Sequence, residues 1–265
     1  MSSNYLIIIR ASCVVLIAKG QAKDIFEIKV DNEIPVNHLL DVANNQDKDR
    51  GTLSEVTLQK MLDHFASEES FLVQSVMLDG KKVKFEEAAI IDGKKKKLIG
   101  FLNDKELEGL SWFFAKEKGG TVVSRDPKTN QMVVFSVKKL EREIQPKMQG
   151  KRISFDVKLK VIGQIEEDRR YPKQNFELSS IQQAEKAVAA EIKKKMMTSL
   201  STLQSKYKTD VIQFGTAMRI QYPRQWQQLK QRWEEEFSQA SVNYDIKVDI
   251  RNYGTIGGRK QKSDS

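Results

Sequence analysis

The strongest constraint on the fold is a strict alternation of apolar and polar side chains between residues 153 and 161. The odd positions are apolar and the even positions are polar, with Ile153, Phe155, Val157, Leu159 and Val161 separated by Ser154, Asp156, Lys158 and Lys160. Successive side chains of a β-strand point to opposite faces of its sheet. The segment therefore predicts a strand with one buried face and one wet face. Residues 242–250 alternate in the same way and predict a second such strand.

Three helices are expected between these two strands. Ser180 and Gln183 have the spacing of a capping box at the start of the first helix. Its apolar stripe advances in steps of three or four through Ile181, Ala184, Val188, Ile192, Met196, Leu200, Leu203 and Tyr207. The second helix is expected over Asp210–Gln221. The third follows Pro223 and carries Trp226, Leu229, Trp233 and Phe237, an aromatic stripe that favours a packed core over a ligand site.

Shorter elements are expected over the first 150 residues. The expected strands are Tyr5–Ala18 (one strand or a pair), Phe71–Leu78, Val83–Ile91, Leu98–Leu102, Thr121–Arg125 and Met132–Val137. The expected helices are Lys23–Val30, Pro35–Asn44, one capped by Ser54 with a face of Leu58, Leu62 and Phe65 beside Met61, and one that begins with a capping box of Asn103 and Glu106. Gly109 costs this last helix about 1 kcal/mol relative to Ala, which indicates that another backbone approaches closely.

These elements predict a multi-domain α+β protein in which mixed or antiparallel sheets pack with amphipathic helices. Four ranges are expected. They are an N-terminal α/β domain over 1–80, a β-rich middle domain over 81–148, a C-terminal α+β domain with long helices over 149–258, and a disordered tail over 259–265.

The residue types present argue against an enzyme, a metal site or a cofactor site. The chain has one cysteine and two histidines, too few for a zinc site of about four clustered ligands. No phosphate-binding glycine loop of the Gly-x-x-x-x-Gly-Lys-Ser/Thr type is present. The carboxylates of Glu234, Glu235 and Glu236 lie beside Arg232 on an amphipathic helix and are interpreted as charges that serve solvation and i,i+4 pairing. The sequence thus predicts a non-enzymatic protein without a cofactor.

The charge predicts an anionic partner surface. The chain carries 45 Lys+Arg and 36 Asp+Glu, a formal net charge of +9. Its densest basic runs, Lys94–Lys97 and Lys193–Lys195, do not alternate with aromatic residues as nucleic-acid stacking platforms do. The charge is therefore interpreted as a solvated surface or as attraction to anionic lipid headgroups, and nucleic acid is not an expected partner.

Cys13 has two interpretations. Ala11 and Ser12 precede it as small residues precede the cysteine of a bacterial lipoprotein cleavage site, but Arg10 stands where that site prefers an aliphatic residue. The favoured interpretation is a buried cysteine within a strand.

Three segments, in order, resemble one known family. They are Arg10–Gly20 (RASCVVLIAKG), Leu98–Trp112 (LIGFLNDKELEGLSW) and the stretch from Leu203 to Phe237 that contains YPRQW and ends in WEEEF. They are similar to the GerC-type (Ger(x)C) subunit of spore germinant receptors from endospore-forming bacteria. The Tyr-Pro-x-x-Trp element is the most specific part, and the resemblance covers nearly the whole chain.

The resemblance implies a non-enzymatic receptor subunit with a multi-domain α+β fold. Members of this family are lipoproteins held by an N-terminal lipidated (palmitate-bearing) cysteine on the outer face of the spore inner membrane. They act with two integral-membrane partners, the A and B subunits, in the response to nutrients. The alternative that remains open is a protein that itself captures the nutrient in a pocket.

In family members a signal peptide, a lipobox and part of the first domain precede the Ala-Lys-Gly strand, which here ends at Gly20. We therefore expect an N-terminally shortened form of the pattern, without its anchor. The expected partner-contact residues are Tyr222, Pro223 and Trp226. The alternative is that they form a helix-packing corner with Trp226 buried.

Overall fold

The computed structural model describes residues 12–27, 53, 55–80, 82–85, 87–114, 120–125, 130, 132–168 and 178–253. The expected helix Pro35–Asn44, the start of the expected strand Tyr5–Ala18 and the expected tail over 259–265 lie outside these residues. The chain divides into two compact units. Unit 1 contains Met1–Asp47, Thr52–Leu107 and Ser201–Ser238, and unit 2 contains Lys48–Gly51, Glu108–Leu200 and Gln239–Ser265. Both units combine helices with a sheet, so the predicted α+β class is confirmed.

The sheet of unit 1 is mixed. Its strands are β1 (Ile17–Ala18), β2 (Phe71–Asp79), β3 (Lys82–Lys84), β4 (Ala88–Asp92) and β5 (Lys97–Leu102). Their order is β1-β2-β4-β5, and β3 pairs with the end of β2. Only the β1–β2 pair is parallel. Residues on both sides of position 80 therefore share one sheet.

Both faces of the unit 1 sheet are covered, because β2 carries apolar side chains at odd and at even positions. Phe71 and Val73 pack with Met61 and Phe65 of α3 (Leu58–Ser67). Val76, on the opposite face, packs with Ile25 of α1 (Ala22–Phe26). Period-two alternation places odd and even residues of a strand on different faces.

The third segment of unit 1 is helical. After the end of α5 (Leu178–Thr202) come a π-helical turn (Leu203–Tyr207), α6 (Phe214–Gln221), α7 (Pro223–Leu229), a 3-10 turn (Lys230–Arg232) and α8 (Trp233–Gln239). Its core contains the buried side chains Leu203, Phe214, Met218, Leu229, Trp233 and Phe237. The predicted aromatic stripe is thus a packed core, with Trp226 half-buried at its margin.

The sheet of unit 2 is built on a long hairpin. Its strands are β6 (Gly120–Arg125), β7 (Met132–Gln149), β8 (Arg152–Asp168) and β9 (Ser241–Tyr253), in the order β6-β7-β8-β9. β7 and β8 are antiparallel and turn at Gly150, which has a positive φ of 61°. β9 is parallel to β8, so the chain must cross over between them, and α5 begins that crossover.

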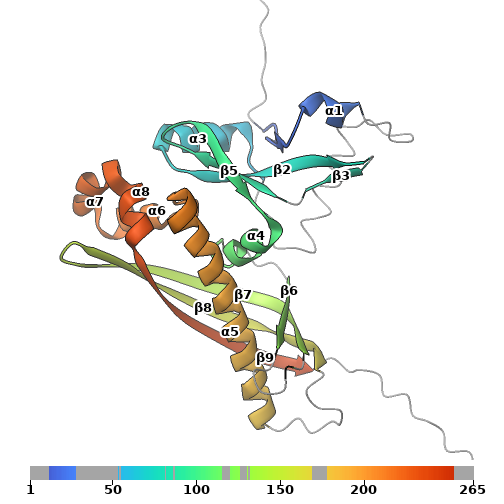
Figure 1. Ribbon diagram of the computed structural model, residues 1–265. Coiled ribbons are helices and arrows are strands. Elements are labelled where there is room, and N and C mark those ends of the chain that lie inside the picture. Colours follow the sequence, from blue (N-terminus) through green and yellow to red (C-terminus); the bar gives the residue numbers. More distant parts are fainter. Residues whose placement is uncertain are drawn as a thin grey trace, which may run out of the picture. The chain divides into compact units, whose positions relative to one another are not determined.

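The predicted alternation in β8 is confirmed. Its odd residues from Ile153 to Val161 are all buried. α5 crosses the face of this sheet (Figure 1), and its predicted stripe is buried at Ala184, Val188, Ile192, Met196 and Leu200. The opposite face of the sheet is polar, with ion pairs such as Lys158–Glu143 and Lys147–Asp156 across neighbouring strands.

The predicted capping box of α4 (Asp104–Ser111) is confirmed. The Asn103 side chain accepts hydrogen bonds from the N–H groups of Lys105 and Glu106, and the Glu106 carboxylate accepts one from the N–H of Asn103. Gly109 lies within α4, and a Cβ there would collide with the Lys195 carbonyl and the Ser199 side chain of α5. The predicted close approach is confirmed.

Several predicted boundaries are wrong, for identifiable physical reasons. α3 starts after Thr57, whose hydroxyl accepts from the N–H of Lys60, and Ser54 is not its cap. Leu62 is 50% exposed, and α3 packs on the sheet through the half-buried Met61 and Phe65. α5 already includes Leu178, which places Ser180 inside the helix rather than at its cap.

Three further predictions need correction. The expected strand Val83–Ile91 is two strands, β3 and β4. The expected helix Asp210–Gln221 begins only at Phe214. Cys13, interpreted as a buried strand cysteine, is exposed and lies just before a single bridge between Val14 and Thr57.

The division into 1–80, 81–148 and 149–258 remains a hypothesis about independently folding domains. The compact units of the structure are not continuous in sequence, since unit 1 takes up Ser201–Ser238 from the last range.

We predict that Gly109→Ala lowers the free energy of unfolding by about 1–3 kcal/mol, because the added methyl group overpacks the contact with α5. Intrinsic helix propensity alone would raise that free energy by about 1 kcal/mol. Urea unfolding measures the change. Gly120→Ala is the control, because a Cβ at Gly120 meets nothing within 4 Å. A stabilised Gly109→Ala variant would contradict the close approach.

Candidate functional site

The expected contact residues Tyr222, Pro223 and Trp226 form the corner between α6 and α7. Tyr222 ends α6 by donating its N–H to the carbonyl of Met218 at 2.8 Å, and its own carbonyl accepts the N–H of Trp226 at 2.9 Å. Pro223 is the first residue of α7, where a missing N–H costs no hydrogen bond and the fixed φ suits the helix. The sequence Tyr-Pro-x-x-Trp therefore ends α6 at Tyr222 and begins α7 at the next residue.

The Trp226 side chain packs on the inner side of the corner. Its ring packs edge-on against Trp233, with centroids 5.2 Å apart and an interplanar angle of 62°. Both rings lie on Gly215, where an added Cβ would come within 2.7 Å of the Trp233 Nε1. Trp226 is half-buried and Pro223 is exposed. The corner thus has a packed inner side and an accessible outer side.

The outer side carries one apolar side chain that the sequence analysis missed. Ile220 is 73% exposed at the end of α6, between the exposed residues Arg219 and Gln221. Helical spacing in the sequence could have identified this exposed isoleucine. Phe214 and Met218 lie on the buried stripe of α6, and Ile220 does not lie on that stripe.

A fully buried carboxylate holds the start of α6. Asp210 accepts hydrogen bonds from the N–H groups of Ile212 (3.2 Å), Phe214 (3.1 Å) and Gly215 (2.7 Å). It also accepts one from Nε1 of Trp233 at 2.9 Å. Burial raises the pKa of Asp210, and these four hydrogen bonds act in the opposite direction. This carboxylate explains why α6 starts at Phe214, because it accepts the first two N–H groups of the helix, those of Phe214 and Gly215, which have no partner within the helix.

Glu234 links α8 to the sheet. Its carboxylate accepts the N–H of Asp210 at 2.9 Å and the hydroxyl of Ser70 at 3.4 Å. The Ser70 hydroxyl in turn accepts the N–H of Gly93, in the turn between β4 and β5. Burial raises the pKa of Glu234 to about 7, and the negative charges of Asp210 and Asp92 add to the rise. The interpretation of Glu234 as a solvated charge is therefore wrong.

Glu69 makes a second link between α3 and α6. Its carboxylate accepts the hydroxyl of Thr216 at 3.0 Å and lies 3.8 Å from Nδ1 of His64 and 3.7 Å from Arg219. The nearby His64 side chain is the main reason that the pKa of Glu69 is lowered, and burial opposes it. The His64 ring stacks on Phe71 with centroids 4.7 Å apart. Contacts within unit 1 thus hold Glu69 in place between α3 and α6.

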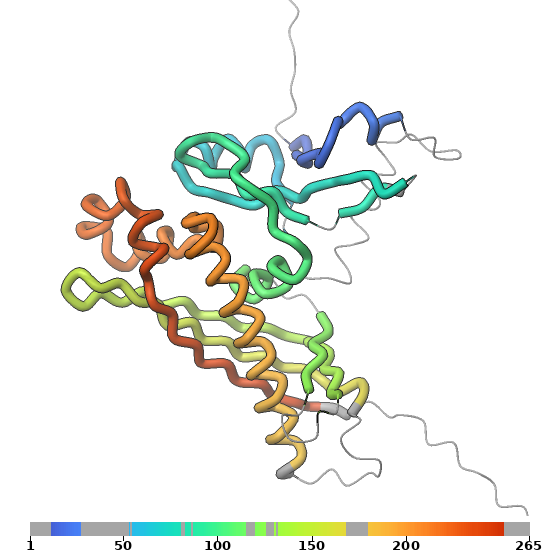
Figure 2. The backbone as a smooth tube through the Cα atoms, in the orientation of Figure 1, coloured from blue at the N-terminus to red at the C-terminus, as the bar shows by residue number. Residues whose placement is uncertain are grey.

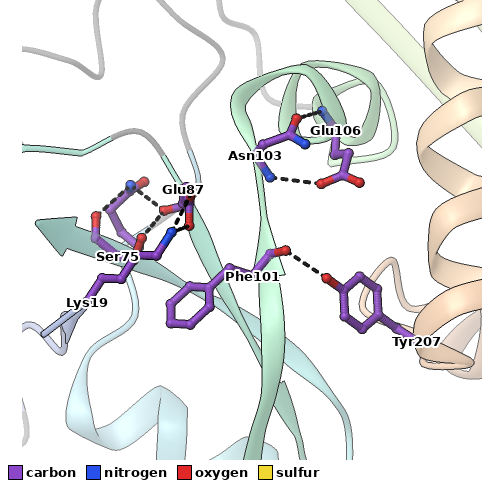
Figure 3. Close-up of polar contacts among 8 residues, drawn as sticks. Lys19, Ser75, Glu87, Phe101, Asn103, Glu106 and Tyr207 are labelled. Atoms are coloured by element: carbon purple, nitrogen blue, oxygen red, sulfur yellow. Dashed lines mark hydrogen bonds and ion pairs between the residues drawn. The ribbon is translucent and has the colours of Figure 1, made fainter.

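A third link joins β5 to the turn after α5. The Tyr207 hydroxyl donates to the carbonyl of Phe101 at 2.8 Å (Figure 3). The Tyr207 ring also fills the space above Gly100, so any larger residue at position 100 would displace it. On the other side of Phe101, Lys19 of the segment after β1 pairs with Glu87 at 2.7 Å (Figure 3).

Within the described residues, no group of three or more His, Cys, Asp or Glu side chains has the arrangement of a metal site. No helix among them is long and apolar enough to cross a membrane. Among the residues that the structure describes, Ile220 is the most exposed large apolar side chain, and it lies beside the corner of Tyr222, Pro223 and Trp226.

We predict that Glu234→Gln changes how stability depends on pH. Because the folded-state pKa of Glu234 is about 7, above its ordinary value of 4.5, this group stabilises the fold at low pH. That contribution is lost as the pH rises from about 4.5 to 7. The free energy of unfolding of Glu234→Gln, relative to wild type, should therefore increase by roughly 2 kcal/mol between pH 5 and pH 8.

Urea unfolding at the two pH values tests this prediction. Glu235→Gln is the control, because Glu235 is an exposed residue of the same helix. Equal pH dependence of wild type and Glu234→Gln would contradict the burial of this carboxylate.

Comparison with known proteins gives one consistent family. The family described as "Spore germination B3/ GerAC like, C-terminal" matches residues 86–254. Spore germination protein YndF of Bacillus subtilis (strain 168) is 37% identical over 248 residues, which cover 94% of this chain and 61% of that protein. Spore germination protein B3 of the same organism is 27% identical, with 94% and 67% covered. The chain thus spans roughly three-fifths to two-thirds of the length of these relatives.

A solved structure agrees with the sequence comparisons. The crystal structure of the GerBC protein matches with a TM-score of 0.76 at 26% identity, covering 92% of this chain and 70% of that one. The resemblance suggested by the three sequence segments is confirmed. The chain belongs to the spore germination B3/GerAC-like family, whose members are the GerC-type subunits of germinant receptors.

Proposed function

We propose that this protein is the non-enzymatic C subunit of a nutrient germinant receptor and acts with integral-membrane A and B subunits to start spore germination. Family membership supports the receptor role. The chemistry of the described residues supports a binding role over a catalytic one, since the carboxylates of the buried Asp210 and of the partly buried Glu234 and Glu69 are each engaged by hydrogen bonds within unit 1. The proposed location is the outer face of the spore inner membrane, where a lipid anchor would hold the protein.

The corner of Tyr222, Pro223 and Trp226 is the proposed contact with a membrane subunit. The observation that carries this proposal is the 73% exposure of Ile220 beside a corner held by Asp210 and by the Trp226–Trp233 pair. An apolar side chain held on a rigid support loses little conformational entropy when a partner covers it. Such preorganised apolar anchors contribute most of the affinity in many protein interfaces.

The anionic membrane surface is a second proposed contact. Four exposed basic residues lie close to the same corner in sequence: Arg219, Arg224, Lys230 and Arg232. Each basic residue near anionic headgroups contributes about 1 kcal/mol. Salt screens this attraction over a Debye length of about 8 Å at physiological ionic strength, whereas an apolar contact through Ile220 is insensitive to salt. The two contacts are therefore separable by ionic strength.

The receptor role is tested by spores that lack this gene. We expect them to lose germination in response to one class of nutrient and to keep the response to a non-nutrient trigger, because only the nutrient pathway needs the receptor. Germination is measured by loss of optical density across a nutrient panel. Unchanged responses to every nutrient would contradict the proposal.

The corner contact is tested by Ile220→Ser. Covering an exposed isoleucine contributes about 1.5–3 kcal/mol, so we expect co-purification with the membrane subunits to weaken by about tenfold or more. The thermal unfolding temperature should not change, since the side chain is exposed. Leu62→Ser, a similar change at an exposed position of α3, is the control and should bind normally. Normal binding by Ile220→Ser would remove the corner from the interface.

A further inference from the structure

Unit 2 has two long stretches of strand edge without a neighbouring strand among the described residues. The first is the part of β7 beyond β6, residues 138–149, because β6 pairs only with residues 132–137. The second is the outer edge of β9, the last strand in the order β6-β7-β8-β9 (Figure 2). An edge with unpaired N–H and C=O groups is a template for another strand.

Proline protects the first edge and not the second. Pro146 lies in β7 opposite Phe155 of β8, and a proline within a strand has no N–H to offer to either neighbour. β9 contains no proline or glycine between Ser241 and Tyr253. Only the β9 edge therefore offers an unbroken row of donors and acceptors.

The backbone groups on the free side of β9 can be identified. The N–H of Ile250 donates to the Glu185 carboxylate of α5 at 3.1 Å, so it points away from β8. The register with β8 is regular from Ser241 to Ile250. Backbone groups alternate in direction along a strand, so those of Val242, Tyr244, Ile246 and Val248 also face the free side. Glu185 occupies this edge at Ile250 and leaves residues 242–248 open.

The side chains of β9 are also incompletely covered. Tyr244, Ile246 and Val248 are half-buried, whereas Val157, Leu159 and Val161, their partners in β8, are fully buried. On the polar face, the side chains of Asp245 and Lys247 are 56% and 76% exposed and their charged atoms are 3.9 Å apart. Another strand beside β9 would gain both apolar and ionic contacts.

We propose that the occupant of this edge is β9 of a second copy of the chain, paired antiparallel about a two-fold axis at Ile246. In this register Ile246 faces Ile246 of the second copy, and Tyr244 faces Val248, so outward backbone groups meet outward backbone groups. Asp245 then lies opposite Lys247 of the second copy, and Lys247 opposite Asp245. In antiparallel pairs of this kind the Cα atoms approach to about 4.5 Å, which is close enough for ion pairing.

Neighbouring registers are less favourable. An axis at residue 245 places Asp245 against Asp245, and an axis at residue 247 places Lys247 against Lys247, and like charges directly opposite destabilise a sheet. An axis at Tyr244 brings no opposite charges together. An axis at Val248 requires Ile250 to leave its hydrogen bond with Glu185. The charge pattern of β9 and the hydrogen bond between Ile250 and Glu185 together select the register with its axis at Ile246.

Sedimentation velocity of the purified chain between about 1 and 200 μM tests the proposal. We expect a concentration-dependent dimer, and Lys247→Asp should weaken dimerisation by about tenfold because it places two like-charge pairs in the interface. The double variant Asp245→Lys, Lys247→Asp exchanges the charges and should restore the wild-type dissociation constant. Lys160→Asp is the control. Lys160 lies on β8 directly beside Lys247 and on the same face of the sheet, but it is not on the edge strand.

Hydrogen exchange reports on the edge itself. The amides of Tyr244, Ile246 and Val248 should be protected in the dimer and should exchange rapidly in Lys247→Asp. A chain that stays monomeric at every concentration would overturn the proposal. A dimer whose dissociation constant is the same in wild type, in Lys247→Asp and in the double variant would also overturn it. Protection of these amides in a monomer only after membrane subunits are added would also overturn it, and would identify an extended partner segment as the occupant.

Discussion

The carboxylate of Asp210 organises the part of unit 1 that carries the proposed receptor contact. It satisfies the first N–H groups of α6, and through the Trp233 indole it fixes the ring on which Trp226 rests. Its own N–H donates to Glu234, which reaches Ser70 at the end of the α3–β2 connection. Removing one hydrogen-bond partner from a buried carboxylate strongly destabilises the folded protein. The helical segment therefore keeps one arrangement on the sheet, and the corner at Tyr222 is presented in one orientation.

Unit 2 illustrates how a sheet can leave one edge available. The odd residues of β8 from Ile153 to Val161 are buried, and Pro146 leaves β7 without an N–H group opposite Phe155. β9 has the same alternation and contains no proline. When two copies of β9 pair antiparallel about Ile246, Asp245 of each copy lies opposite Lys247 of the other. Natural proteins usually protect long edges. An unprotected edge with a self-complementary charge pattern is thus a candidate interface rather than an ordinary surface.

Periodicity in the sequence was enough to predict the strands around Phe155 and Ile246 and the stripe of α5, because each depends on residues close together in the chain. It failed where a distant side chain decides the structure. α6 starts late because the Asp210 carboxylate binds its first N–H groups, and the partly buried Glu234 accepts a hydrogen bond from Ser70, 164 residues away in sequence. The corner at Tyr222 could be singled out only by its resemblance to a family motif, since local patterns do not distinguish packing from contact.

The most direct test of the account is photo-crosslinking from position 220 in spore membranes. A photoreactive amino acid at Ile220 should give a covalent product with an integral-membrane subunit of the receptor, because the side chain points outward beside a rigid corner. The same amino acid at Gln59, an exposed position of α3, should give none. Crosslinking from position 59 and not from position 220, or from neither position, would contradict the proposed contact.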